Sequence, residues 1–157
     1  MTREDAYYER IMLLCGYWDN YDEWLDSYLE TEDPLSDIVL ELLDCHGDIK
    51  EVEHRLNLYC LEAPFDEESV YIRLRLYLRD GYKNGNLSKD DVMSALFRFS
   101  QKIPFCDFQN QCGVLSDYCD LAENGILVMK EFDVELNRWL DQGGQVNIDP
   151  LWKMRSR

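Results

Sequence analysis

The most informative feature of this 157-residue chain is a stretch without basic residues. No lysine or arginine lies between Arg10 and Lys50, and the same stretch holds eleven acidic residues. Residues 1–68 contain 20 Asp and Glu against 4 Lys and Arg, whereas residues 69–157 contain 12 of each kind. The whole formal charge of −16 therefore lies in the first 68 residues. A surface of one sign repels nucleic acid and anionic lipid and attracts basic molecules.

Long apolar runs are missing too. No stretch approaches the ~20 apolar residues that a membrane-spanning helix requires. The first ten residues are acidic and aromatic, where a signal peptide would be basic and then apolar. The six cysteines are an even number, but a core built from 46% apolar residues needs no disulfides, so we expect reduced, mostly buried thiols. These features predict a cytoplasmic protein.

The chain also lacks the motifs of common catalytic sites. It contains no G-x-S-x-G, no H-E-x-x-H, no P-loop and no G-x-G-x-x-G. It has only two histidines, and neither lies near an obvious nucleophile, so general-base chemistry has no clear candidate. The sequence predicts a protein that is not an enzyme and that binds no cofactor.

The apolar residues that are present recur at the spacing of an α-helix. One such stripe consists of Tyr21, Trp24, Leu25, Tyr28 and Leu29. Capping signals such as Thr2 with Asp5 and Ser88 with Asp91 fall between the stripes, and Asp33-Pro34 reads as a further helix start. Together they predict eight helices, over residues 3–16, 20–30, 34–45, 49–62, 67–81, 89–102, 109–123 and 129–142.

One segment departs from the helical period. Residues 70–79 alternate between apolar and other side chains, which is typical of a strand. The acidic residues just before this segment and Arg79 at its end favour a helix, because they suit the helix dipole. We therefore expect a single all-α domain over residues 1–157, a bundle of about eight helices with an acidic half (1–68) and a charge-balanced half (69–157). A strand at 70–79 is the alternative.

The acidic residues of the two helices at 20–30 and 34–45 fall opposite the apolar stripes. Like charges three or four residues apart each destabilise a helix by roughly 0.2–0.5 kcal/mol. The acidic face of these two helices is either an ordinary solvated surface or a surface that binds a basic partner. The segregation of charge along the chain favours a binding surface. Trp18 lies at a helix junction, where it could be an exposed anchor or part of the core. The candidate partner-binding residues are Trp18, Asp19, Asp22, Glu23, Asp26, Glu30, Asp37 and Glu41.

Two loops resemble degenerate EF-hands, at residues 80–91 and 120–131. Tyr82 and Ala122 replace the ligand at the third position of each loop, which lowers the number of available oxygen ligands. A helix that stops at Asn-Gly and is followed by a cap explains both loops, so we expect no metal site. The calcium-binding alternative rests on Asp80, Asn84, Asp91, Asp120, Asn124 and Glu131.

The segment without basic residues, 11–49, and the aromatic and acidic segment 18–26 resemble the immunity proteins of bacterial polymorphic or contact-dependent growth inhibition toxin systems. The resemblance lies in the general character of the whole chain, which is small, helical and acidic, and it rests on no diagnostic motif. It implies a cognate toxin domain, often a basic nuclease, that is bound and blocked by an acidic face.

Three other functions fit an acidic helical chain. A DNA-mimic inhibitor would space its carboxylates like phosphates and would bind a DNA-binding protein. A secretion chaperone would need an exposed apolar groove. A calcium-binding regulator would need the two EF-hand-like loops to hold metal.

Overall fold

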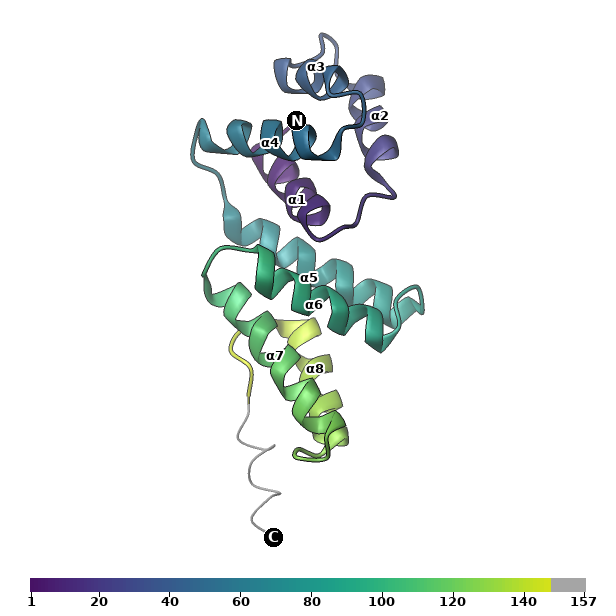
Figure 1. Ribbon diagram of the computed structural model, residues 1–157, viewed down its shortest axis with the longest axis vertical. Coiled ribbons are helices and arrows are strands. Elements are labelled where there is room, and N and C mark those ends of the chain that lie inside the picture. The colour runs from purple at the N-terminus through teal and green to yellow at the C-terminus, as the bar shows by residue number, and fades with distance from the viewer. Residues whose placement is uncertain (148–157) are drawn as a thin grey trace. The chain divides into compact units, whose positions relative to one another are not determined.

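A computed structural model describes residues 1–147 of the chain (Figure 1). As the sequence predicts, the fold is all-α, and the described residues form eight helices and no strand. Within this range no helix combines the length and the apolar character that crossing a membrane requires. The helices are α1 (Arg3–Leu14), α2 (Tyr21–Thr31), α3 (Asp37–Asp44), α4 (Ile49–Leu61), α5 (Glu67–Asn84), α6 (Lys89–Lys102), α7 (Asp107–Glu123) and α8 (Met129–Gln142).

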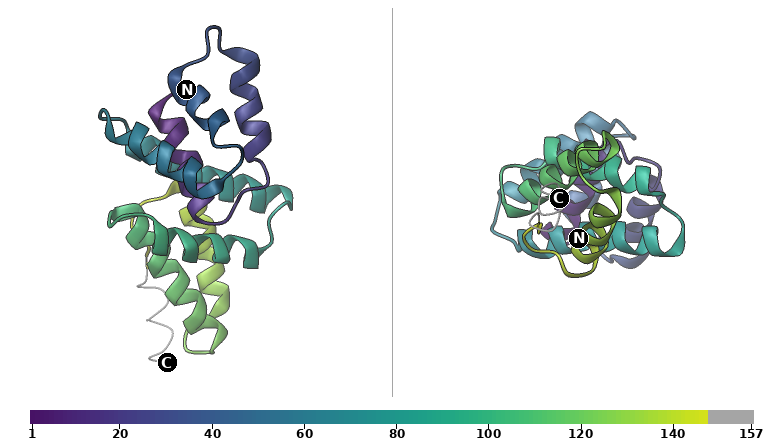
Figure 2. Two further views of the ribbon diagram at one scale, coloured as in Figure 1. Left: turned by 45° about the horizontal axis from the view of Figure 1, so that its top comes forward. Right: turned by 90° about the horizontal axis from the view of Figure 1, so that it is seen from below.

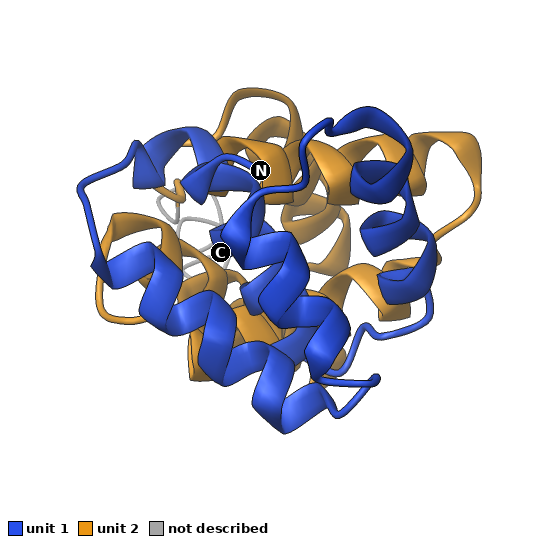
Figure 3. Ribbon diagram, turned by 90° about the horizontal axis from the view of Figure 1, so that it is seen from above, with its two compact units in different colours: residues 1–70 blue, residues 71–157 orange. Residues whose placement is uncertain are grey.

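The chain divides into two compact units, which Figure 3 colours separately. Unit 1 is Met1–Val70 and unit 2 is Tyr71–Arg157, so α5 begins in the first unit and continues in the second. The division falls two residues after the point at which the sequence changes from acidic to charge-balanced. The excess negative charge of the protein is thus a property of unit 1.

Unit 1 is built around α1 and α4, which pack on each other, while α3 packs on both α4 and α2. Its core is mainly aliphatic. Ile11 from α1, Val39 from α3 and Leu56 from α4 are essentially inaccessible to solvent. The ring of Tyr7 packs against that of Phe65, with centroids 5.1 Å apart. Burial of these side chains, at roughly 1.5–3 kcal/mol each, is the main force that holds the unit together.

Unit 2 is a bundle in which α6 packs on α7 and α7 on α8, as the two views of Figure 2 show. Aromatic rings form the centre of its core. The ring of Phe108 stacks on Tyr71 from α5 at 5.1 Å and on Trp139 from α8 at 5.9 Å. The indole N–H of Trp139 donates to Gln111 Oε1 at 3.0 Å, so this buried ring leaves no unsatisfied donor.

The strand alternative for residues 70–79 is wrong, because this segment belongs to α5. Val70, Leu74 and Leu78 are fully buried, at a spacing of four residues, whereas Ile72 is half exposed. The alternation in the sequence arises because apolar residues also occupy positions that α5 turns away from the core. The burial pattern has the helical period.

The start of α3 was predicted three residues too early, at the Asp33-Pro34 pair. The helix begins at Asp37 with Ser36 as its N-cap residue. A contact just before the helix explains the difference: Glu32 Oε2 accepts hydrogen bonds from the Ser36 N–H at 3.0 Å and from its hydroxyl at 2.7 Å, while the amino group of Met1, far away in the sequence, pairs with the same carboxylate. These bonds hold residues 32–36 in a turn that a helix starting at Pro34 would break.

Most helix ends follow the signals in the sequence. Ser88 and Asp91 form a reciprocal capping box at the start of α6, and Thr2 Oγ1 accepts from the Asp5 N–H at α1. Helix α8 ends at Gly143, which has a φ of 67°. The positive φ favours glycine here, and a Cβ atom at this position would also lie 2.9 Å from Nε of Arg75, so that this side chain would have to shift. All six cysteines are thiols, and five of them are buried.

Candidate functional site

Helix α2 presents one buried and one acidic side. Tyr21 and Leu25 are buried, while Asp22, Glu23 and Asp26 are exposed together with Glu30. The predicted stripe is only partly buried, because Trp24, Tyr28 and Leu29 are half-buried. The main packing partner of α2 is α3, and a helix of eight residues cannot cover the whole stripe. The rings of Trp24 and Tyr28 instead pack edge to face, with centroids 5.2 Å apart.

Helix α3 repeats this arrangement. Ile38, Val39 and Leu42 are buried, whereas Asp37, Glu41 and Asp44 are exposed with Leu40. The partner-binding residues predicted from the sequence are therefore all at the surface: Trp18, Asp19, Asp22, Glu23, Asp26, Glu30, Asp37 and Glu41.

Trp18 is an exposed aromatic residue held in a defined orientation. It lies between α1 and α2, and 53% of its surface is accessible. Its indole Nε1–H donates to the carbonyl oxygen of Leu13 at 2.8 Å, at the end of α1. The neighbouring Asp19 and Asn20 are also exposed. A large ring that is already fixed before binding loses little side-chain entropy when a partner covers it.

Few cations of unit 1 reach the acidic stretch. Arg55 contacts Glu41 at 3.9 Å, and the amino group of Met1 pairs with Glu32. Asp48 caps α4 by accepting from the N–H groups of Lys50 and Glu51. No other acidic residue between Arg10 and Lys50 makes an ion pair with any residue in the part of the chain that the structure describes. We refer to these eight exposed residues as the acidic surface: Asp19, Asp22, Glu23, Asp26, Glu30, Asp33, Asp37 and Asp44.

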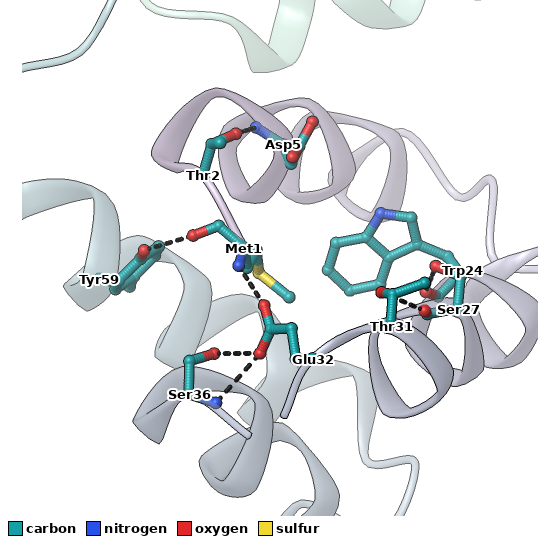
Figure 4. Close-up of polar contacts among 9 residues, drawn as sticks. All are labelled: Met1, Thr2, Asp5, Trp24, Ser27, Thr31, Glu32, Ser36 and Tyr59. Carbon is teal, nitrogen blue, oxygen red and sulfur yellow. Dashed lines mark hydrogen bonds and ion pairs between the residues drawn. The ribbon is translucent and has the colours of Figure 1, made fainter. Parts of the chain in front are cut away.

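Glu32 differs from the other acids of the stretch because it is a structural residue. Figure 4 shows its carboxylate between the amino group of Met1 and Ser36. The hydrogen bond from the amino group, followed by those from Ser36, lowers the pKa of Glu32 to about 2. The Tyr59 hydroxyl donates to the Met1 carbonyl at 2.8 Å, so this cluster also reaches α4. Sequence spacing gives no signal for such a contact, since the partners are 31 residues apart.

Sequence reasoning also missed a buried acid, Glu9 on α1, which is 6% exposed. Its burial raises the pKa of its carboxyl group to about 7. The signal was present, because Glu9 lies three residues after the buried Ala6 and four before the buried Leu13, on the apolar side of α1.

The two EF-hand-like loops are helix junctions in which the expected ligands have other contacts. Asp80 pairs with Arg79 at 2.9 Å, and Asp91 belongs to the capping box of α6. The Oδ1 atom of Asn84 accepts from the Asn86 N–H at 2.9 Å. In the second loop the side-chain amide of Asn124 donates to the main-chain oxygen of Asp120 at 2.8 Å, and Glu131 lies in the first turn of α8. Among residues 1–147 no group of three or more His, Cys, Asp and Glu side chains is arranged to hold a metal ion.

No protein-family model, curated protein or solved structure matches this chain.

The surface must therefore be interpreted from its chemistry. It offers exposed carboxylates in a region with few internal cations, next to an oriented indole ring. Carboxylates accept charge-assisted hydrogen bonds from Lys and Arg, and an indole face attracts the same cations. The arrangement suits recognition of a basic surface.

Proposed function

We propose that this protein is a non-catalytic bacterial immunity protein that acts in the cytoplasm. In this proposal the acidic surface of unit 1 binds a cognate basic toxin domain of nuclease-like character and occludes its active site. Neither nucleic acid nor membrane is a partner, because a net charge of −16 repels both. No cofactor takes part.

One observation carries the proposal: the eight residues of the acidic surface are exposed and make no ion pair with the described chain. Carboxylates that stabilise a fold are normally paired or serve as caps, as Glu32 and Asp48 do. Repulsion among the others reduces the stability of α2 and α3. A basic partner would relieve this repulsion on binding. The repulsion energy that is removed would add to the binding free energy of the complex.

The mechanism we infer has two stages. The summed negative potential first attracts the basic domain from a distance, which raises the association rate. Trp18 then packs against the partner and excludes water from the neighbouring charge pairs, which slows dissociation. A catalytic residue of the toxin needs no direct contact, because a partner bound over its substrate channel blocks access.

The test compares two triple charge reversals that are matched in position. Asp22→Lys, Glu23→Lys and Asp26→Lys change two first-turn acids and one later acid of α2. The control reverses Asp90, Asp107 and Asp117, which are two first-turn acids and one mid-helix acid of unit 2. All six residues are exposed, and none makes an ion pair with a described residue. Both variants therefore change the net charge equally.

The measurements are the association rate with the cognate toxin domain, and the growth of cells that co-express the two proteins. We expect the α2 variant to bind at least about 10-fold more slowly and to lose protection, while the control keeps both. The wild-type rate should also fall steeply as salt exceeds 0.1 M, where the Debye length is about 10 Å. Equal losses in both variants would mean that net charge alone matters, and an unaffected α2 variant would refute the proposal. Binding to a DNA-binding protein instead of the toxin would favour a DNA mimic.

A further inference from the structure

Glu9 is a buried acid for which the fold provides no partner. It lies on α1 among core residues, and its carboxyl group makes no hydrogen bond or ion pair with any residue in the range 1–147. Burial without a compensating contact penalises the charged form of a carboxyl group far more than the neutral form. This burial is the cause of the pKa of about 7 noted above.

The cations of unit 1 are placed elsewhere. Arg10, next to Glu9 in the sequence, donates to Glu53 of α4 at 2.7 Å. Arg3 bonds to Glu62, and Arg55 bonds to Glu51. Lys50, the fourth basic side chain of the unit, is exposed. The amino group of Met1 pairs with Glu32, so unit 1 offers no positive charge to an ionised Glu9.

The titratable groups around Glu9 do not offset this burial. From α2 the neighbour is Tyr21, a buried residue whose hydroxyl has no hydrogen-bond partner among residues 1–147. Burial, followed by the charges of Cys45 and Glu9, raises the pKa of Tyr21. Cys45 follows α3, and its thiol already has a hydrogen-bond partner, because it donates to the Glu41 carbonyl at 3.3 Å. On α4, the carboxylate beside α1 is Glu53, which Arg10 already neutralises.

We propose that Glu9 makes the stability of unit 1 pH-sensitive. The folded form of the unit is most stable when this carboxyl group is neutral, and the unit opens more readily when the group ionises. The direction follows from linkage. A carboxyl group that holds its proton more tightly in the folded state stabilises the fold fully below its unfolded pKa, near 4.5. That stabilisation is lost as the pH rises through about 7. The proposal does not depend on the proposed function, since it concerns the opening of unit 1 with or without a partner.

The experiment measures hydrogen-exchange protection factors of the full chain, corrected for intrinsic exchange, at pH 5 and pH 8.5. In the wild type we expect protection in α1 and α4 to fall on the order of 100-fold over this range, following the shift in pKa. Glu9→Gln keeps the shape of the side chain and both histidines but cannot ionise, so its protection in α1 and α4 should change much less. The control Glu30→Gln removes an exposed acid from the same unit and should behave as the wild type does.

Protection in α7 and α8 separates a local from a global effect. Helices α7 and α8 belong to unit 2, so the proposal requires the larger change in α1 and α4. The same loss of protection in Glu9→Gln as in the wild type would overturn it, as would a variant less protected than the wild type at pH 8.5. If Glu9→Gln does not fold, the carboxyl carbon of Glu9 in the wild type can be titrated by NMR. A midpoint near 7 supports the proposal, and a midpoint below 5 overturns it.

Discussion

Units 1 and 2 use acidic side chains in different ways. In unit 2, acids connect helices: Lys83 of α5 pairs with Asp141 of α8, and Lys89 of α6 pairs with Asp133 of α8. In unit 1, α2 and α3 carry acids of which only Glu41 contacts a cation of the described chain. Acids also link α1 to α4 in unit 1, through Glu53 and Arg10, but the other acids of α2 and α3 lie at the surface without a cation of the described chain. Charge composition alone cannot distinguish these roles, whereas the position of the nearest cation can.

The largest effect should come from a buried acid of unit 2. Glu135 Oε1 accepts from Arg138 at 2.5 Å and from the Asn147 N–H at 2.8 Å, and it thereby holds the segment after α8. Glu135→Ala removes the carboxylate that pairs with the partly buried guanidinium of Arg138 and that accepts from the Asn147 N–H, and the guanidinium keeps only the carbonyl oxygens of Gly143 and Gln145. We expect the free energy of unfolding to fall by about 2–4 kcal/mol in urea titrations. The comparison variant Asp26→Ala, in unit 1, should change it by less than about 0.5 kcal/mol. Similar losses in both variants would remove the distinction between the units.

Glu32 is an acid of the stretch without basic residues that does support the fold, and a pair of neutral variants tests it. Glu32→Gln should lower the free energy of unfolding at pH 7 by about 1–2 kcal/mol, reduced from the full effect of the pKa shift by solvent screening. The pKa of Glu32 is lowered to about 2, so its contribution is present above pH 4.5 and disappears as the pH falls through 2. The variant and the wild type should therefore converge near pH 2. Asp33→Asn, at the adjacent exposed position, should have little effect at either pH.

A smaller effect, of opposite sign, should follow neutralisation of the acidic surface. Asp26 and Glu30 are one turn apart on α2, and Glu30 lies near the negative end of the helix dipole. Asp26→Asn with Glu30→Gln should raise the free energy of unfolding by about 0.5 kcal/mol at 20 mM salt, since like charges at this spacing repel. The gain should shrink at 0.5 M salt, where charges are screened over about 4 Å. Destabilisation at low salt would show that these acids support the fold.

Calcium should have the smallest effect. The acids of both EF-hand-like loops lie in unit 2, where Asp91 is a capping residue and Asp80 is paired. Millimolar calcium should leave the melting temperature unchanged, because a ligand stabilises a protein only in proportion to its binding. A rise of several degrees that is lost in Asp120→Ala with Glu131→Ala would contradict this and would favour a calcium-binding function.

The helices could be predicted because their signals are local. The ranges 89–102 and 129–142 match the structure at both ends, where apolar stripes are bounded by Ser88 and by Gly143. The exposure of the candidate acids on α2 and α3 follows from the same periodicity, whereas that of Trp18, which lies between two helices, does not. The start of α3 could not be predicted in this way, since it depends on Glu32 and its bonds to Ser36 and the chain terminus. Periodicity also cannot show which acids have partners, because Glu41 meets Arg55 only after α3 and α4 have packed.

The acidic surface has a consequence for how the protein can change. Its carboxylates form no ion pair within the described chain, so the stability of unit 1 places few demands on which side chain stands at each position. The core beneath them, with Val39 and Leu56, can stay constant while Asp22, Glu23 or Asp26 is exchanged. Substitutions on this surface can accumulate without loss of the fold, and under the proposed function they would alter the choice of toxin partner. Unit 1 can therefore serve as a fixed scaffold for a changeable set of specificities.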